Sequence, residues 1–203
     1  TELAGLVEDL ASRGVAEESE GALVVRVEGI DEPCLVRKRD GGFLYATTDL
    51  AAIRRRVQEL GADRVIYCVD ARQSLHFRLV FGVAHKAGYT LRPDGSRAKL
   101  EHAAFGTVLG EDGKPLKTRS GENIKLDDLL QEAVDRARAE IGARADNLRV
   151  DDPGATAEAV GIAAIKYADL QPERSRDYVF GFDRMVSFEG NTGPYLLCAR
   201  ARL

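Results

Sequence analysis

The sequence predicts an α/β fold, in which a parallel sheet with helical crossovers is followed by a helical segment. Two features of the 203-residue chain predict it. Between residues 43 and 109, apolar runs of strand length alternate with helical patterns, an order typical of parallel strands joined by right-handed crossovers. After residue 125 the strand-like runs end and apolar residues recur at helical spacing.

The first forty residues predict one helix and two short strands. Residues 2–13 repeat leucine and valine at helical spacing. Residues 22–27 and 34–39 are short apolar-rich runs, and the segment 28–33 between them has the composition of a turn. We therefore expect small strands near 22–39 beside the main sheet.

A strand and a helix are predicted after the glycine pair at 41 and 42. Residues 41–47 predict the strand. Residues 47–61 predict a helix that Thr47 or Thr48 caps and Gly61 ends. The expected apolar face of this helix contains Leu50, Ile53, Val57 and Leu60.

Two more strands and a second helix complete the predicted sheet. Residues 63–70 form a nearly continuous apolar run, as expected for a strand covered on both faces. Residues 72–88 predict a helix, again ended by glycine, and residues 99–109 predict a third strand. That strand turns through residues 110–113 into the basic segment DGKPLKTRSGE.

The last eighty residues predict helices. In the first helix, residues 126–142, one apolar stripe contains Leu130, Val134, Ala137 and Ile141. An acidic, proline-marked linker then leads to a helix over 155–170, and we expect the tail from Gln171 to Leu203 to be mostly helical.

Composition limits the functional classes. A net charge of −4 argues against a general coating of positive charge for nucleic acid, although local basic patches can still meet RNA. No apolar run approaches the roughly 20 residues of a membrane span, so no membrane role is expected. The three cysteines lack metal-ligand spacing and suggest buried thiols of a reducing cytoplasm, with no bound metal site.

The chain ends suggest an excised piece. It begins with Thr1 rather than methionine and stops at Leu203 inside an apparently helical stretch. We expect it to be part of a longer, cytoplasmic protein.

Polar residues cluster where predicted strands end, which is where open α/β sheets bind ligands. Tyr45 and Asp49 stand four residues apart where a strand meets a helix, and could hold a planar cation through a carboxylate and a phenol. The alternative is that Asp49 only complements the helix dipole and Tyr45 only packs.

The next strand end carries a second polar group. Asp70 ends the apolar run, and Gln73 and His76 follow in the first turn of the next helix. Gln73 is placed for neutral hydrogen bonding to a ligand. The alternatives are that Gln73 and Arg72 are exposed turn residues, and that His76 is a histidine of the core or its boundary.

The third extended run and the basic segment suggest a nucleotide site. His102 and Gly106 lie on a run where backbone could approach a flat base. The basic segment then presents cations and hydroxyls suited to phosphoryl or adenylyl transfer: Lys114, Lys117, Thr118, Arg119 and Ser120. The alternative is an ordinary solvated turn, since no Walker sequence is present.

Four segments taken together resemble one family. DGGFLYATTDLAA, DRVIYCVDARQSLHF, GKPLKTRSGE and GNTGPYL are similar, in the same order, to segments of arginyl-tRNA synthetases, which are class I aminoacyl-tRNA synthetases. The similarity runs from about residue 18 to residue 203. It implies the C-terminal half of a Rossmann-like parallel-sheet catalytic domain followed by a helical segment.

The resemblance implies specific roles. Such enzymes use ATP, with which we expect Mg²⁺, to form arginyl-adenylate, and transfer the arginyl group to tRNA(Arg). Tyr45, Asp49 and Gln73 resemble residues that bind arginine. The residues that resemble the adenine-side strand edge are His102, Phe105, Gly106, Thr107 and Val108.

The basic segment falls where class I synthetases carry the Lys-Met-Ser-Lys-Ser loop. It reads PLKTRS, so Pro115 and Thr118 replace the two lysines of that signature. We expect Lys114, Lys117, Thr118, Arg119 and Ser120 to handle ATP, with Lys117 and Arg119 as the catalytic cations.

A second departure concerns the His-x-Gly-His element of class I synthetases, which this sequence lacks. We therefore expect the first half of the catalytic fold to lie upstream and the chain alone to be inactive. The resemblance implies three parts: the second half of the catalytic domain over 1–125, a helical connection over 126–190, and the start of the anticodon-binding domain over 191–203. The intact protein is expected to be a monomer.

Two other functions stay open. One is a synthetase-like module that binds RNA or protein without catalysis, and the other is a class I synthetase for another amino acid. RNA phosphates could be contacted by the 54–56 arginine run and by Arg136 and Arg138, each of which could equally be part of a solvated helix face.

Overall fold

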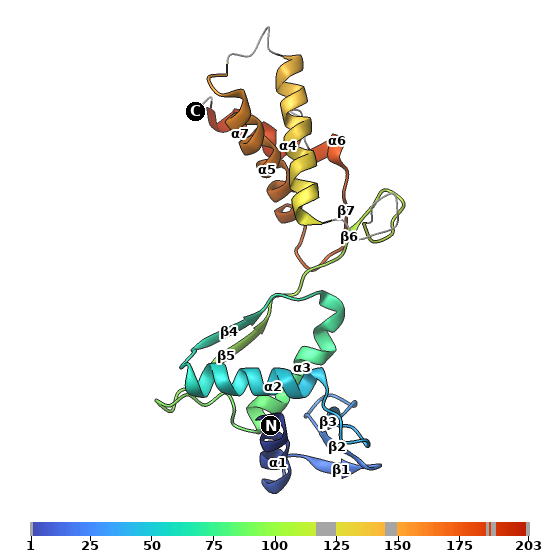
Figure 1. The fold of residues 1–203 in the computed structure, drawn as a ribbon, viewed down its shortest axis with the longest axis vertical. Helices are drawn as coiled ribbons and strands as arrows, with labels where there is room; N and C mark the ends of the chain where they lie inside the picture. Colours follow the sequence, from blue (N-terminus) through green and yellow to red (C-terminus); the bar gives the residue numbers. More distant parts are fainter. Residues whose placement is uncertain (1, 117–124, 145–149, 186, 188–189, 202–203) are drawn as a thin grey trace. The chain divides into compact units, whose positions relative to one another are not determined.

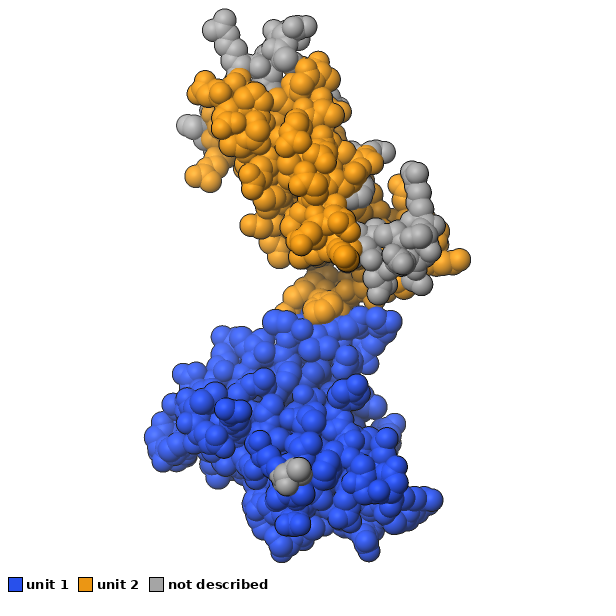
Figure 2. All heavy atoms as spheres, in the orientation of Figure 1, with its two compact units in different colours: residues 1–104 blue, residues 105–203 orange. Residues whose placement is uncertain are grey.

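The computed structural model describes residues 2–116, 125–144, 150–185, 187 and 190–201. The chain forms two compact units, Thr1–Ala104 and Phe105–Leu203, which Figure 2 shows in different colours. The division falls inside the strand predicted over 99–109. That prediction is wrong: two strands, β5 (Lys99–His102) and β6 (Val108–Leu109), lie in different units.

The first unit combines a small antiparallel sheet with a parallel strand pair and three main helices (Figure 1). Its elements follow in this order: α1 (Glu2–Ser12), β1 (Glu17–Ser19), β2 (Ala22–Val25), β3 (Cys34–Arg37), α2 (Tyr45–Arg54), a π-helical turn (Arg55–Glu59), β4 (Arg64–Tyr67), a 3-10 turn (Ala71–Gln73), α3 (Ser74–Lys86) and β5.

The predicted parallel pairing is confirmed for β4 and β5. Their register runs from Arg64 opposite Lys99 to Tyr67 opposite His102. The 3-10 turn and α3 lie between these strands in the sequence, so the connection is a helical crossover. The carboxyl ends of both strands therefore meet at one edge.

The expected small strands near 22–39 are also confirmed. Strands β1, β2 and β3 form an antiparallel sheet in that order, with Val25 opposite Cys34. Strand β1 could not be predicted from the sequence, because Glu17, Glu18 and Ser19 carry no apolar alternation.

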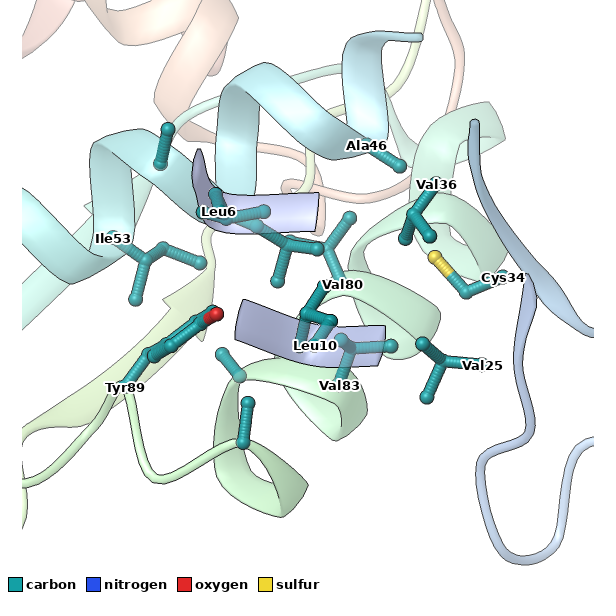
Figure 3. Close-up of a cluster of buried hydrophobic side chains, with 14 of the residues drawn as sticks. Leu6, Leu10, Val25, Cys34, Val36, Ala46, Ile53, Val80, Val83 and Tyr89 are labelled. Atoms are coloured by element: carbon teal, nitrogen blue, oxygen red, sulfur yellow. The ribbon is translucent and has the colours of Figure 1, made fainter. Parts of the chain in front are cut away.

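One core holds the first unit together. Figure 3 shows the side chains of α1, β2, β3, α2 and α3 converging on it. Fully buried residues from these elements include Leu6, Leu10, Val25, Val36, Ile53, Val80 and Val83. Burial of this apolar surface stabilises the helices that carry the polar strand-end residues.

The strand predicted over 41–47 is wrong, because α2 begins at Tyr45. The Thr47 hydroxyl donates to the Val36 carbonyl oxygen at 2.6 Å and accepts from the Leu44 backbone N–H at 3.3 Å. This capping, together with the contact to β3, outweighs the strand preference of the aromatic residues. Thr47 was predicted to precede the helix as its cap, but the N-cap is Leu44, and Thr47 completes the capping from the third helical position.

The predicted apolar face of α2 holds only in part. Leu50, Ile53 and Val57 are buried, but Leu60 is 69% exposed. The π-helical turn adds a residue to its turn and rotates Leu60 off the face. Gly61, at φ +68°, ends the helix as predicted.

The strand predicted over residues 63–70 was expected to be covered on both faces, and this expectation is wrong. Val65 is 7% exposed but its neighbour Ile66 is 47% exposed, so burial along β4 alternates. Among the cysteines, Cys34 is buried as expected, whereas Cys68 just after β4 is exposed. All three cysteines are free thiols.

The described part of the second unit contains β6, β7 (Tyr178–Val179) and four helices: α4 (Leu126–Ala143), α5 (Pro153–Leu170), α6 (Phe182–Met185) and α7 (Gly193–Ala201). Strands β6 and β7 pair in parallel. The helices predicted over 126–142 and 155–170 are confirmed. In α4, Val134, Ala137 and Ile141 are buried as predicted, and Leu130 is partly buried.

The prediction of a mostly helical tail from Gln171 is confirmed only in part: α6 and α7 are helices, but the segment before them contains a strand. Tyr178 and Val179 form β7, which pairs with β6 far away in the sequence. Within the described ranges, none of the helices is long and apolar enough to cross a membrane.

Candidate functional site

Asp49 and His76 meet near the carboxyl ends of β4 and β5. Asp49 lies on α2 and His76 on α3, and Asp49 Oδ2 is 2.7 Å from His76 Nε2. Each side chain is 28% exposed. An ionised carboxylate only accepts hydrogen bonds, so Nε2–H of His76 is the donor. The Asp49 carboxylate is therefore half-buried and is oriented by His76.

Tyr45 is the first residue of α2 and stands one helical turn before Asp49. Residues four apart in a helix share a face, so both side chains leave α2 on the same side. The Tyr45 side chain is 86% exposed. The alternative that Tyr45 merely packs therefore has no support in the described part of the chain.

Gln73 ends the 3-10 turn that follows β4. Its backbone N–H donates to the Asp70 carbonyl oxygen at 3.0 Å, and its side chain is exposed. Gln73 precedes His76 by three residues, which places both on one side of the α3 start. The structure thus places Tyr45 and Asp49 on one face of α2 and joins Asp49 to His76, which follows Gln73 by three residues.

The Asp70 carboxylate stabilises this turn through hydrogen bonds. Its Oδ1 accepts from the Arg72 backbone N–H at 2.8 Å, and the Arg72 guanidinium donates to both carboxylate oxygens. This bidentate pair compensates the charge of Asp70. Asp49, which faces a histidine rather than an arginine, is the carboxylate better suited to receive a cation.

An aromatic cluster lies beneath the carboxylate. Phe77 is 4.8 Å from Tyr67 and 4.7 Å from His102, measured between ring centroids. His102 donates from Nε2 to the Val69 carbonyl oxygen at 2.9 Å, which fixes its ring. Burial raises the pKa of Tyr67, a nearby arginine opposes this rise, and the charge of Asp49 adds to it.

His76 and Tyr67 are the residues whose place in this group the sequence analysis missed. The available signal was weak: His76 follows Gln73 by one helical turn at a strand end. Its carboxylate partner lies 27 residues away on another helix. That pairing depends on how α2 packs against α3.

In the second unit, Gly106 and Thr107 are tied to the loop before β7. The Gly106 N–H donates to the Arg174 carbonyl oxygen at 2.9 Å, and the Thr107 N–H donates to Asp177 Oδ1 at 2.6 Å. A Cβ on Gly106 would overlap the Arg176 carbonyl. The Cβ side of this glycine therefore faces protein backbone, while the predicted contact of residues 105–108 with a base stays a prediction.

The start of the basic segment, up to residue 116, is described. The Gly110 N–H donates to the Lys114 carbonyl oxygen at 2.8 Å, and Leu109 bridges Pro115 in antiparallel fashion. Phe105 is 43% exposed, and Lys114 is also exposed. The other predicted loop residues lie outside the described residues: Lys117, Thr118, Arg119 and Ser120.

The five arginines considered for RNA contact all have partners within the chain. Arg54 and Arg56 lie over the rings of Tyr89 and Tyr67, at 5.7 and 5.6 Å from the centroids. The other three pair with acidic side chains: Arg55 with Glu59 at 3.8 Å, Arg136 with Glu132 at 2.7 Å and Arg138 with Asp135 at 2.7 Å. These contacts favour solvated helix faces, and RNA contact stays a prediction.

Curated relatives similar to this chain are arginine–tRNA ligases. The protein of Frankia casuarinae is 51% identical over 99% of the chain, and that of Cellvibrio japonicus is 50% identical over 100%. The chain covers 34% and 35% of these two proteins. It thus spans about a third of the length of the curated relatives it matches.

Solved structures agree. Arginyl-tRNA synthetase from Plasmodium falciparum matches with a TM-score of 0.81 and 29% identity, over 98% of this chain and 33% of that one. The Thermus thermophilus enzyme, at 24% identity, shares the fold with a TM-score of 0.78, over 99% of this chain and 39% of that one. A family model described as "tRNA synthetases class I (R), catalytic domain" matches residues 1–182. The chain therefore belongs to the family of class I (R) tRNA synthetase catalytic domains.

Proposed function

We propose that this chain is part of an arginine–tRNA ligase, which forms arginyl-adenylate from arginine and ATP and transfers the arginyl group to tRNA(Arg). The single observation that carries the proposal is the Asp49 carboxylate, held by His76 at the strand edge beside the exposed phenol of Tyr45. The names of its relatives support the same activity.

The strand edge suits a guanidinium in three respects. A carboxylate has about four acceptor positions, so Asp49 can still receive paired N–H groups beyond the one from His76. The Tyr45 ring can lie against the planar cation. The Gln73 amide can donate to or accept from the substrate without adding charge.

ATP handling is assigned to residues within 102–120. We place the adenine beside His102, Phe105, Gly106, Thr107 and Val108. The cation and hydroxyl groups proposed to meet the phosphates belong to the basic segment: Lys114, Lys117, Thr118, Arg119 and Ser120. Mg²⁺ would enter with the ATP phosphates.

Lys117 and Arg119 are proposed to stabilise the negative charge that develops as pyrophosphate leaves. The remaining half of the ATP site, including a His-x-Gly-His element, must come from residues outside this sequence. This chain alone is therefore proposed to be inactive.

The functional division of the chain is proposed at residues 125 and 190. Residues 1–125 would form the second half of the catalytic domain, residues 126–190 a helical connection, and residues 191–203 the beginning of an anticodon-binding region. We further propose that the intact protein is a cytoplasmic monomer.

Kinetics of aminoacylation by the full-length protein test the proposal. Asp49→Asn should raise the KM for arginine by about a hundredfold, because the guanidinium loses its charge-assisted partner. The KM for ATP should change little. Asp63→Asn, which neutralises an exposed acid just before β4, is the matched control.

Three results would contradict the proposal. An unchanged KM for arginine in Asp49→Asn would remove the guanidinium assignment. A full-length protein that binds tRNA but never aminoacylates it would favour a non-catalytic synthetase-like module. Activity with another amino acid alone would instead indicate a different specificity.

A further inference from the structure

We infer that His76 is a positioning residue for arginine recognition. Its Nε2–H holds the Asp49 carboxylate in the orientation that receives the guanidinium. This inference rests on the proposed function of Asp49 and extends it to a residue that does not itself touch the substrate.

The geometry of the pair carries the first step. The 2.7 Å separation between Nε2 and Oδ2 is that of a charge-assisted hydrogen bond. Asp49 Oδ1 accepts no hydrogen bond from any residue that the structure describes. The side chain would otherwise rotate among its staggered positions, so the imidazole selects one of them. One carboxylate edge is left free to accept a substrate.

The imidazole is itself held in place. His76 makes an edge contact with Phe77, at 5.1 Å between ring centroids and 80° between ring planes. Phe77 is 4% exposed and packs between Tyr67 and His102. Because the His76 ring is held by packing at the start of α3, its N–H keeps Asp49 in a fixed position, as a preorganised site requires.

The chemistry of imidazole suits this role. An imidazole can donate a hydrogen bond without carrying a positive charge, whereas an arginine or lysine cannot. Asp70 shows the contrast, because the Arg72 guanidinium pairs with its carboxylate. A histidine orients Asp49 and leaves its negative charge available for a cationic substrate.

The same pair could instead only join α2 to α3. A purely structural tie would affect every substrate alike and would lower the melting temperature. A positioning role predicts a selective effect on the guanidino group. Arginine and citrulline distinguish the two, because citrulline replaces the cationic guanidinium by a neutral ureido group of similar size.

The experiment uses the full-length protein with three variants. His76→Leu removes the donor and keeps the bulk, and His76→Gln returns an N–H at a similar reach. His85→Leu is the matched control, since His85 lies on the same helix but its partner is Thr90, outside the candidate site. Each variant is measured for the KM of arginine and of ATP, inhibition by citrulline, and thermal unfolding.

We expect His76→Leu to raise the KM for arginine about tenfold, since small misplacements of a binding group reduce productive binding on at least this scale. The KM for ATP should stay within about twofold. The ratio of the citrulline inhibition constant to the arginine KM should fall, and His76→Gln should restore most of both values. His85→Leu should match the unaltered protein in these ratios.

A double-mutant cycle with Asp49→Asn completes the test. Once the carboxylate is gone, His76→Leu should add less than about twofold to the arginine KM. If the two substitutions raise the arginine KM by independent factors that multiply in the double variant, the inference is overturned. An unchanged arginine KM in a folded His76→Leu variant would overturn it as well. If Asp49→Asn itself leaves arginine binding unchanged, the proposed function fails and this inference fails with it. If only His76→Leu is silent, the proposed function stands.

Discussion

Gly106 lies directly against the backbone of Arg176, where a Cβ on the glycine would overlap the carbonyl carbon and oxygen. The same Cβ would be 2.6 Å from the Asp177 backbone nitrogen. Two hydrogen bonds, from the Gly106 and Thr107 N–H groups, join this strand entry to the loop before β7. The glycine is needed for the close approach of two chain segments.

Gly106→Ala should therefore destabilise the second unit. An overpacked contact against backbone costs about 1–3 kcal/mol in the free energy of unfolding. Gly142→Ala is the control, because Gly142 is exposed within α4 and a Cβ there meets no atom within 4 Å. In urea denaturation, Gly106→Ala should have a lower free energy of unfolding than the unaltered protein. Gly142→Ala should have the same or a slightly higher one. Equal stability of the two variants would mean that the Gly106 contact is not tight.

Thr47 fixes the start of the helix that carries Tyr45 and Asp49. Its hydroxyl, fully buried, connects to the Val36 carbonyl and the Leu44 N–H. Thr47→Val should cost about 1–3 kcal/mol, because these hydrogen bonds are lost in a buried place. Thr48→Val, at the exposed neighbouring position, should cost under about 0.5 kcal/mol. Thermal unfolding checks this, and equal losses would argue against the anchoring role.

Asp152 is the N-cap of α5. Its Oδ1 accepts from the Ala155 N–H at 3.0 Å, and Pro153 occupies the first helical turn. Asp152→Ala should reduce stability by about 1 kcal/mol, while Asp152→Asn, which keeps the acceptor, should lose much less. Denaturant midpoints compare them. A loss as large in Asp152→Asn as in Asp152→Ala would show that charge rather than capping matters.

Glu101 on β5 should titrate well below an ordinary glutamate. Hydrogen bonds from Arg64 and then Lys99 lower its pKa to about 2. Because the folded-state pKa is depressed, its stabilising contribution is present above the unfolded value near 4.5 and is lost as pH falls toward 2. Carboxyl NMR should show the low midpoint, and Arg64→Gln should raise it. A midpoint near 4.5 in the unaltered protein would contradict the exposed ion pair.

The sequence predicted the fold wherever local pattern decides it. The helices, the parallel pair and the spacing of Tyr45 and Asp49 all follow from periodicity and glycine placement within short segments. The prediction from sequence failed where a contact with a residue distant in the chain determines the local structure. Residues 41–47 resemble a strand, but Thr47 reaches Val36 on β3 and a helix begins instead. The short β7 depends in the same way on pairing with β6.

The same distinction between local pattern and distant contacts applies to the candidate site. Gln73 could be found from a strand end, whereas Tyr45 and Asp49 were found from their spacing and the family resemblance, since α2 begins where a strand was predicted. The hydrogen bond that orients Asp49 could not, because His76 lies 27 residues away and meets it only when α2 and α3 pack. Likewise, Leu60 leaves the apolar face because of a π-helical turn, for which the sequence carried no signal.

The central claim is that the Asp49 carboxylate, oriented by His76, binds the substrate guanidinium. The most direct measurement is a crystal structure of the full-length protein with arginine bound. The account predicts guanidinium nitrogens about 3 Å from the Asp49 oxygens, the Tyr45 ring within about 6 Å of the cation, and Nε2 of His76 still on Oδ2. An arginine side chain bound elsewhere, with Asp49 bonded to His76 alone, would contradict it.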